Sequence, residues 1–101
     1  MIDSHVSPPL DLTTKVLASK DVLAAELGGE VSLLDVKSGI YFTLNPVGAN
    51  VWRQIQEAKS LAGIKQQLLA EYDVEAHRCE DDLRQLLSEL QASGLIEFIP
   101  A

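Results

Sequence analysis

Cys79 and His77 are the first residues to consider for chemistry, because a thiol beside an imidazole is a common nucleophile–base pair. The segment around them has a helical pattern, and residues two apart on a helix project about 200° apart, so the two side chains do not face each other. Cys79 also falls on a stripe of leucines, which predicts a small buried hydrophobe. His77 is predicted to be a solvated surface histidine. The pair therefore does not predict a catalytic centre.

The other groups that could bind a metal or move a proton are isolated or badly spaced. One cysteine and two separate histidines give no ligand spacing. Glu80, Asp81 and Asp82 are consecutive, so on a helix they spread around its axis rather than converging on one ion, and they predict a solvated face. Asp35 follows an apolar run and is interpreted as a turn residue. We therefore expect no catalytic residue, no metal site and no cofactor, and the sequence does not predict an enzyme.

Composition and charge narrow the class of partner. The 101 residues suit a single domain, with the 47% hydrophobic and 23% charged residues of a soluble globular protein. The net charge of −7 repels polyanions, which weighs against nucleic acids and anionic membranes. The helical segment 75–92, which would be the DNA-recognition helix, has five acidic and two basic residues, so DNA phosphates would repel it.

The single cysteine, the lack of a signal peptide and the lack of a membrane-length apolar run predict a cytoplasmic protein.

The first half of the chain predicts an arm followed by a small sheet. Residues 1–15 are rich in Ser, Thr and Pro and have no period, so we expect a flexible arm before a domain at 16–101. Glycine-containing turns separate β-rich runs and predict an antiparallel meander, with Gly39 at positive φ. The predicted strands are 22–27, 31–36 and 40–44.

The second half predicts helices. Asn45–Pro46 marks the change of period, because Asn is a preferred N-cap and Pro fits the first helical turn. A second helix follows Ser60, and a third runs from about 75 to 92. Residues 95–99 predict a short closing strand or a docked tail. Strands followed by helices predict an α+β domain, winged helix-turn-helix-like, in which a three-stranded antiparallel sheet precedes three helices.

The third predicted strand, 40–44, contains no Lys, Glu or Pro that would protect a sheet edge. If that edge is free, an extended peptide could pair with it, main chain to main chain, and place alternate side chains in nearby pockets. The closing strand, or a second copy of the chain, could instead cover the same edge. Alternation puts Tyr41 and Thr43 on one face and Ile40, Phe42 and Leu44 on the other, without deciding which face a ligand would contact.

The run from Gly39 to Trp52, GIYFTLNPVGANVW, resembles the signature of the PqqD family. In that signature a strand with a Tyr leads to Leu-Asn, a small-residue turn and an Ile/Val-Trp pair. The run from Val31 to Asp35, the break at Tyr72-Asp73-Val74 and the leucine-rich ending before Gly94-Leu95 are similar as well. The order and spacing of these segments together make the resemblance, which covers roughly residues 16 to 98.

This resemblance implies a peptide-recognition domain for ribosomally synthesised, post-translationally modified peptides. Family members are winged helix-turn-helix folds that bind the leader segment of a precursor peptide as an added strand. The implied function is a non-catalytic peptide chaperone that presents the leader to a modifying enzyme. That enzyme would be a radical S-adenosylmethionine (SAM) protein in a pyrroloquinoline quinone pathway, or a leader peptidase in a lasso-peptide pathway. Stand-alone family members in lasso-peptide pathways are similar in length to this chain.

Carried over by position, the resemblance implies that the leader pairs with strand 40–44 and packs against the third helix. The expected peptide-binding residues are Ile40, Tyr41, Phe42, Thr43, Leu44, Arg78, Asp82, Gln85 and Leu86. Residues expected to be core are Leu44, Trp52, Leu83, Leu87 and Leu90. The alternative is a structural or oligomerisation module, in which the same edge pairs with a second copy in a homodimer.

Overall fold

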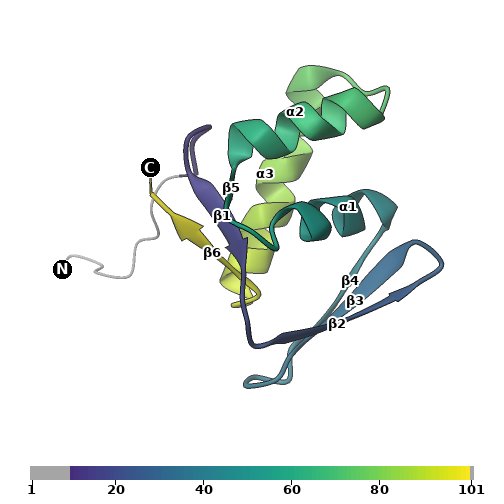
Figure 1. The fold of residues 1–101 in the computed structure, drawn as a ribbon, viewed down its shortest axis with the longest axis vertical. Coiled ribbons are helices and arrows are strands. Elements are labelled where there is room, and N and C mark those ends of the chain that lie inside the picture. The colour runs from purple at the N-terminus through teal and green to yellow at the C-terminus, as the bar shows by residue number, and fades with distance from the viewer. Residues whose placement is uncertain (1–9, 101) are drawn as a thin grey trace.

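The computed structural model describes residues 10–100, which form two small sheets and three helices (Figure 1). The element bounds, in chain order, are β1 Lys15–Ala18, β2 Val22–Leu27, β3 Glu30–Asp35, β4 Tyr41–Leu44, α1 Pro46–Gln54, β5 Lys59–Ser60, α2 Leu61–Glu71, α3 Ala76–Ala92 and β6 Ile96–Ile99. The predicted α+β class, with an antiparallel three-stranded sheet before three helices, is confirmed. Within the described part of the chain, no helix combines the length and apolar character needed to cross a bilayer.

The predicted meander is the sheet β2-β3-β4, and its turns use glycine as expected. Leu27 pairs with Glu30, so Gly28 and Gly29 alone make the first turn, at φ 62° and 85°. Positive φ at both central residues gives the tight hairpin whose twist matches that of the flanking strands. Gly39 stands at φ 76° in the second turn. Glycine supplies these conformations without the steric cost that a side chain would bring.

A second sheet, in the order β5-β1-β6, was not predicted. Its central strand β1 begins at Lys15, which pairs with Ser60 on one side and with Ile99 on the other. Ordered contacts thus begin before residue 16, where we expected the domain to start, and Thr14 is already only 2% exposed. Residues 1–9, the rest of the expected arm, lie outside the described residues. The closing segment is the strand β6.

The first two helices begin where their capping residues predicted. The side chain of Asn45 accepts a hydrogen bond from the Gly48 N–H at 2.8 Å, and Pro46 occupies the first turn of α1. The hydroxyl of Ser60 accepts from the Gly63 N–H at 3.0 Å at the start of α2. These bonds satisfy N–H groups that have no partner inside the helix.

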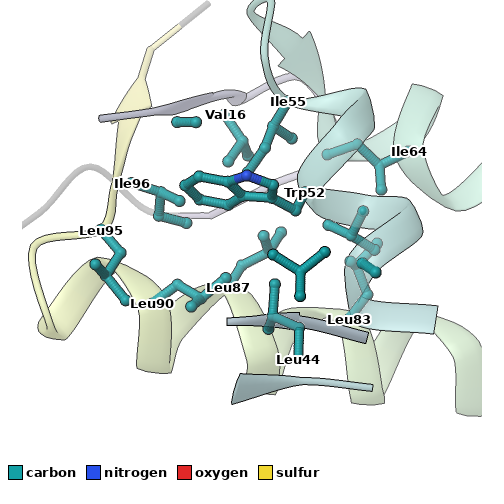
Figure 2. Packing of buried hydrophobic residues seen from close by; sticks show 14 of the residues in the cluster. Val16, Leu44, Trp52, Ile55, Ile64, Leu83, Leu87, Leu90, Leu95 and Ile96 are labelled. Carbon is teal, nitrogen blue, oxygen red and sulfur yellow. The ribbon is translucent and has the colours of Figure 1, made fainter. Parts of the chain in front are cut away.

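The core lies where the three helices meet the inner face of the meander and the second sheet. Figure 2 shows Trp52 of α1 among side chains from β1, β4, α3 and β6. The residues expected to be core are all buried: Leu44, Trp52, Leu83, Leu87 and Leu90. Cys79, at 8% exposure, is the predicted buried thiol. Val47, in the first turn of α1, stays outside this core at 42% exposure.

Candidate functional site

The outer edge of β4 has no backbone partner within residues 10–100. β4 is the last strand of its sheet, and it pairs with β3 alone. The alternative in which the closing strand covers this edge is wrong, because β6 pairs with β1 in the other sheet. The edge is therefore open to an incoming strand.

The register identifies which groups point outward. The Asp35 N–H donates to the Ile40 carbonyl at 2.9 Å, so Ile40 directs its carbonyl towards β3. In an antiparallel ladder this direction alternates, so Phe42 and Leu44 also face β3, whereas Tyr41 and Thr43 face away from it. The N–H and C=O groups of Tyr41 and Thr43 are the ones that an added strand would meet.

A groove of about 590 Å³ runs beside this edge. Its walls come from β4, the start of α1, the end of α2, the α2–α3 connection and one flank of α3. None of the lining residues belongs to β2 or β3, which places the groove on the outer side of β4. Backbone pairing capacity and a ready-made cleft thus lie side by side.

The part of the groove nearest the strand is apolar. Phe42 and Leu44 line it from the inner face of β4, and Leu83 and Leu86 line it from α3. The Leu44 side chain packs closely against α1 at Gly48. A Cβ at Gly48 would lie 3.2 Å from the Leu44 side chain, so glycine permits this close approach of the helix to Leu44. Phe42 and Leu86 are only half-buried, which leaves apolar surface for a ligand to cover.

The far part of the groove lies between the helices, and the sequence did not predict it. This apolar end is formed by Leu68 of α2, by Tyr72 and Val74 of the connection to α3, and by Val47 of α1. Val47 and Val74 are 42% and 48% exposed. Apolar side chains that stay exposed, such as these two valines, mark the pocket. The sequence alone does not show their exposure, because it depends on where the neighbouring helices lie.

Charged side chains stand along the α3 wall. The Arg78 Nε lies 3.7 Å from an Asp82 oxygen, and both side chains are exposed. Glu89 also lines the groove. Cys79 lies in the wall, and burial raises the pKa of its thiol, which disfavours the nucleophilic thiolate.

The structure brings six of the nine predicted site residues to the groove: Phe42, Thr43, Leu44, Arg78, Asp82 and Leu86. Ile40, Tyr41 and Gln85 do not line it. Ile40 precedes β4, the Tyr41 side chain is 65% exposed on the outer face of the sheet, and Gln85 is exposed on α3. The role of each residue in binding remains a prediction.

The histidine that was considered as a base for Cys79 does not line the groove. His77, the base closest to Cys79 in the chain, is exposed and lies 3.5 Å from Asp81 through its Nε2. No group of three or more His, Cys, Asp or Glu between residues 10 and 100 could hold a metal ion. What the site offers is an unpaired strand edge and apolar surface, which together suit an extended peptide.

Comparison with known proteins agrees with this geometry. The family described as "Coenzyme PQQ synthesis protein D (PqqD)" matches residues 30–96. The chain belongs to the PqqD family. The predicted resemblance is thereby confirmed, and the segment that matches PqqD runs from β3 to the start of β6, so it contains β4 and all three helices.

Solved structures similar to this PqqD-family chain carry leader peptides. "TbiB1 in Complex with the TbiA(beta) Leader Peptide" is 36% identical, with a TM-score of 0.74 over 80% of this chain and 94% of that one. "Lasso peptide synthetase B1 complexed with the leader peptide" is 28% identical, with a TM-score of 0.70 over 80% and 95%. A leader peptide is the class of ligand that the sequence predicted. The search of curated proteins gave no match.

Proposed function

We propose that this chain binds the leader segment of a ribosomally synthesised precursor peptide, as a strand added to β4, and presents it to a modifying enzyme. The observation that carries the proposal is the unpaired outer edge of β4 beside an apolar groove. The leader-bound structures of similar chains support it.

An added strand would use β4 in two ways. Its backbone would pair with the outward groups of Tyr41 and Thr43, so Tyr41 contributes main chain rather than side chain. Its side chains opposite Phe42 and Leu44 would point into the groove and pack against Leu86, because paired residues share a face of the sheet. Arg78 and Asp82 would stand at the rim.

The chain itself would carry out no chemistry. Its work would be to hold the leader so that an enzyme can reach the rest of the precursor in the cytoplasm. A leader peptidase of the lasso-peptide type is the partner we favour, because a similar structure is a lasso peptide synthetase B1. A radical SAM protein is the counterpart in the quinone pathway.

The substitution Thr43→Pro tests the proposal. The Thr43 N–H points away from β3, so proline removes a donor that the fold does not use, and edge strands tolerate proline. Losing that bond and adding the ring should weaken peptide binding by about tenfold or more. The probe is a peptide that the unaltered chain enriches from a displayed library of random extended peptides, with its affinity measured by fluorescence anisotropy.

The other edge of the same sheet provides a matched control. The Val36 N–H donates to the Asp21 carbonyl at 3.0 Å, so alternation along β2 directs Ala24 away from β3. Ala24→Pro therefore removes an outward donor from the opposite edge, and peptide binding should be unchanged. If Ala24→Pro abolishes binding while Thr43→Pro does not, or if no peptide is enriched at all, strand addition to β4 is wrong.

A further inference from the structure

We propose that the groove selects a cationic leader, with a basic side chain of the bound strand placed against Glu89. The inference rests on the proposed function and narrows its substrate class. It concerns the charge of the bound peptide, which the apolar contacts of the groove do not determine.

Glu89 is the uncompensated charge of the groove. It is exposed beside Leu86 on the α3 wall, and within residues 10–100 it has no ion pair. The other carboxylate of the lining, Asp82, already has Arg78 as a neighbour at 3.7 Å. Arg78 and Glu89 are eleven positions apart on the helix, which is about 16 Å along the axis, so Arg78 is too far away to neutralise the charge of Glu89.

Four of the seven lysines and arginines that lie outside the groove form ion pairs with carboxylates other than Glu89. Lys37 pairs with Asp21, Arg53 pairs with Glu26, and both Lys65 and Arg84 pair with Glu80. Among the groove-lining residues, Arg78 is the single basic side chain. The net charge of −7 adds a long-range attraction for positive ligands, so local and overall charge favour the same partner.

Strand geometry fixes where the basic residue must stand. Peptide side chains opposite Phe42 and Leu44 point into the groove, whereas those beside them point to the outer face of the sheet. A basic residue that reaches the α3 wall must therefore be an even number of positions from the apolar anchors. Its methylene stem can lie along Leu86 while its charge meets Glu89. At an odd separation it would point away from α3.

The experiment repeats the library selection with three proteins: the unaltered chain, Glu89→Lys and Glu57→Lys. Glu57 is exposed in the turn after α1 and does not line the groove, so both variants change the net charge equally. The unaltered chain and Glu57→Lys should enrich peptides with a Lys or Arg at an even separation from paired apolar residues. Glu89→Lys should lose that preference and bind those peptides about two- to fivefold more weakly.

Each outcome decides something. Enrichment of peptides without a basic residue, or with one equally at odd and even separations, overturns the charge selection and leaves leader binding intact. An equal loss in Glu89→Lys and Glu57→Lys assigns the preference to overall charge and overturns the role of Glu89. Failure to enrich any peptide would contradict the proposed function itself. Circular dichroism checks that both variants are folded.

Discussion

Two adjacent leucines of α3 separate folding from binding. Leu87 is fully buried among the helices, whereas Leu86, one residue earlier, is half-buried and lines the groove. A step of one residue turns a helix by about 100°, which is enough to move a side chain from the core to its flank. The two positions carry the same side chain in the same helix, so they make a matched pair.

We expect Leu87→Ala to lower the free energy of unfolding by about 2–5 kcal/mol, because it leaves a cavity in the core. Leu86→Ala should cost clearly less stability and should instead weaken peptide binding, since it removes part of the groove wall. Urea unfolding and fluorescence anisotropy measure the two effects. If Leu86→Ala destabilises the chain as much as Leu87→Ala and leaves affinity unchanged, Leu86 belongs to the core.

For single residues, the sequence predicted which side chains are buried better than it predicted which way each strand side chain points. The leucine stripe identified Leu83, Leu87 and Leu90 as core because helical periodicity alone places them on one face. It could not show that Tyr41 faces solvent while Phe42 faces α3, since either face of an alternating strand could have been covered. Glu89 was counted in the charge of the helix but was not predicted as a site residue, because a lone carboxylate on a helix looks the same in sequence whether or not a groove lies beside it.

Between elements, a carboxylate joins α2 to α3. Glu80 of α3 accepts from the Lys65 Nζ of α2 at 2.8 Å and from the Arg84 Nε at 2.9 Å. Arg84 also donates to the Leu10 carbonyl, which ties the segment before β1 to the helix. The Glu80 side chain is 23% exposed, so this junction is partly shielded from solvent.

The junction predicts a pH dependence. Hydrogen bonds from Lys65 and then from Arg84 hold the pKa of Glu80 below its ordinary value of 4.5. A carboxylate with a depressed folded-state pKa contributes stability that is present above its unfolded pKa and is lost as pH falls through the lower folded value. Glu80→Gln should therefore flatten the loss of stability below about pH 4.5, as measured by urea unfolding across pH.

Glu57→Gln serves as its control, because Glu57 is exposed and has no ion pair or side-chain hydrogen bond with the described residues. It should leave the acid limb of the stability curve as steep as in the unaltered chain. A Glu80→Gln curve that is equally steep would show that the junction does not contribute to acid sensitivity.

The elements that the sequence missed depend on distant partners. β1 has four residues and β5 only two, which are too few to show the alternating apolar pattern of a strand. Ser60 of β5 is also the N-cap of α2. Their strand conformation comes from pairing with each other and with β6 at the other end of the chain. The meander and the helices were predictable because glycine turns, capping residues and apolar periodicity are local properties.

For the molecule as a whole, the question is whether a second copy competes with the peptide. The meander has two edge strands, β2 and β4, and β2 carries Leu23 and Leu27, which are 62% and 85% exposed. Either edge could pair with another chain. Only pairing through β4 would block the groove, so the oligomerisation alternative makes a distinct prediction.

If β4 is reserved for a peptide, sedimentation of the chain at increasing concentration should give the same oligomeric state in the presence and absence of saturating library-selected peptide. Thr43→Pro should leave that state unchanged. A tight dimer that no peptide perturbs, and that Thr43→Pro dissociates, would instead support a structural role for this edge.

The pairing of β1 with β6 has a consequence for synthesis on the ribosome. Lys15 lies opposite Ile99, so β1 cannot complete this pairing until β6, roughly 80 residues later in the chain, has been translated (Figure 1). The meander 22–44 can pair as soon as it leaves the exit tunnel, because its contacts are short in sequence. The nascent chain would thus display its β4 edge before the second sheet closes, and a premature stop before β6 would yield a product that never completes its core.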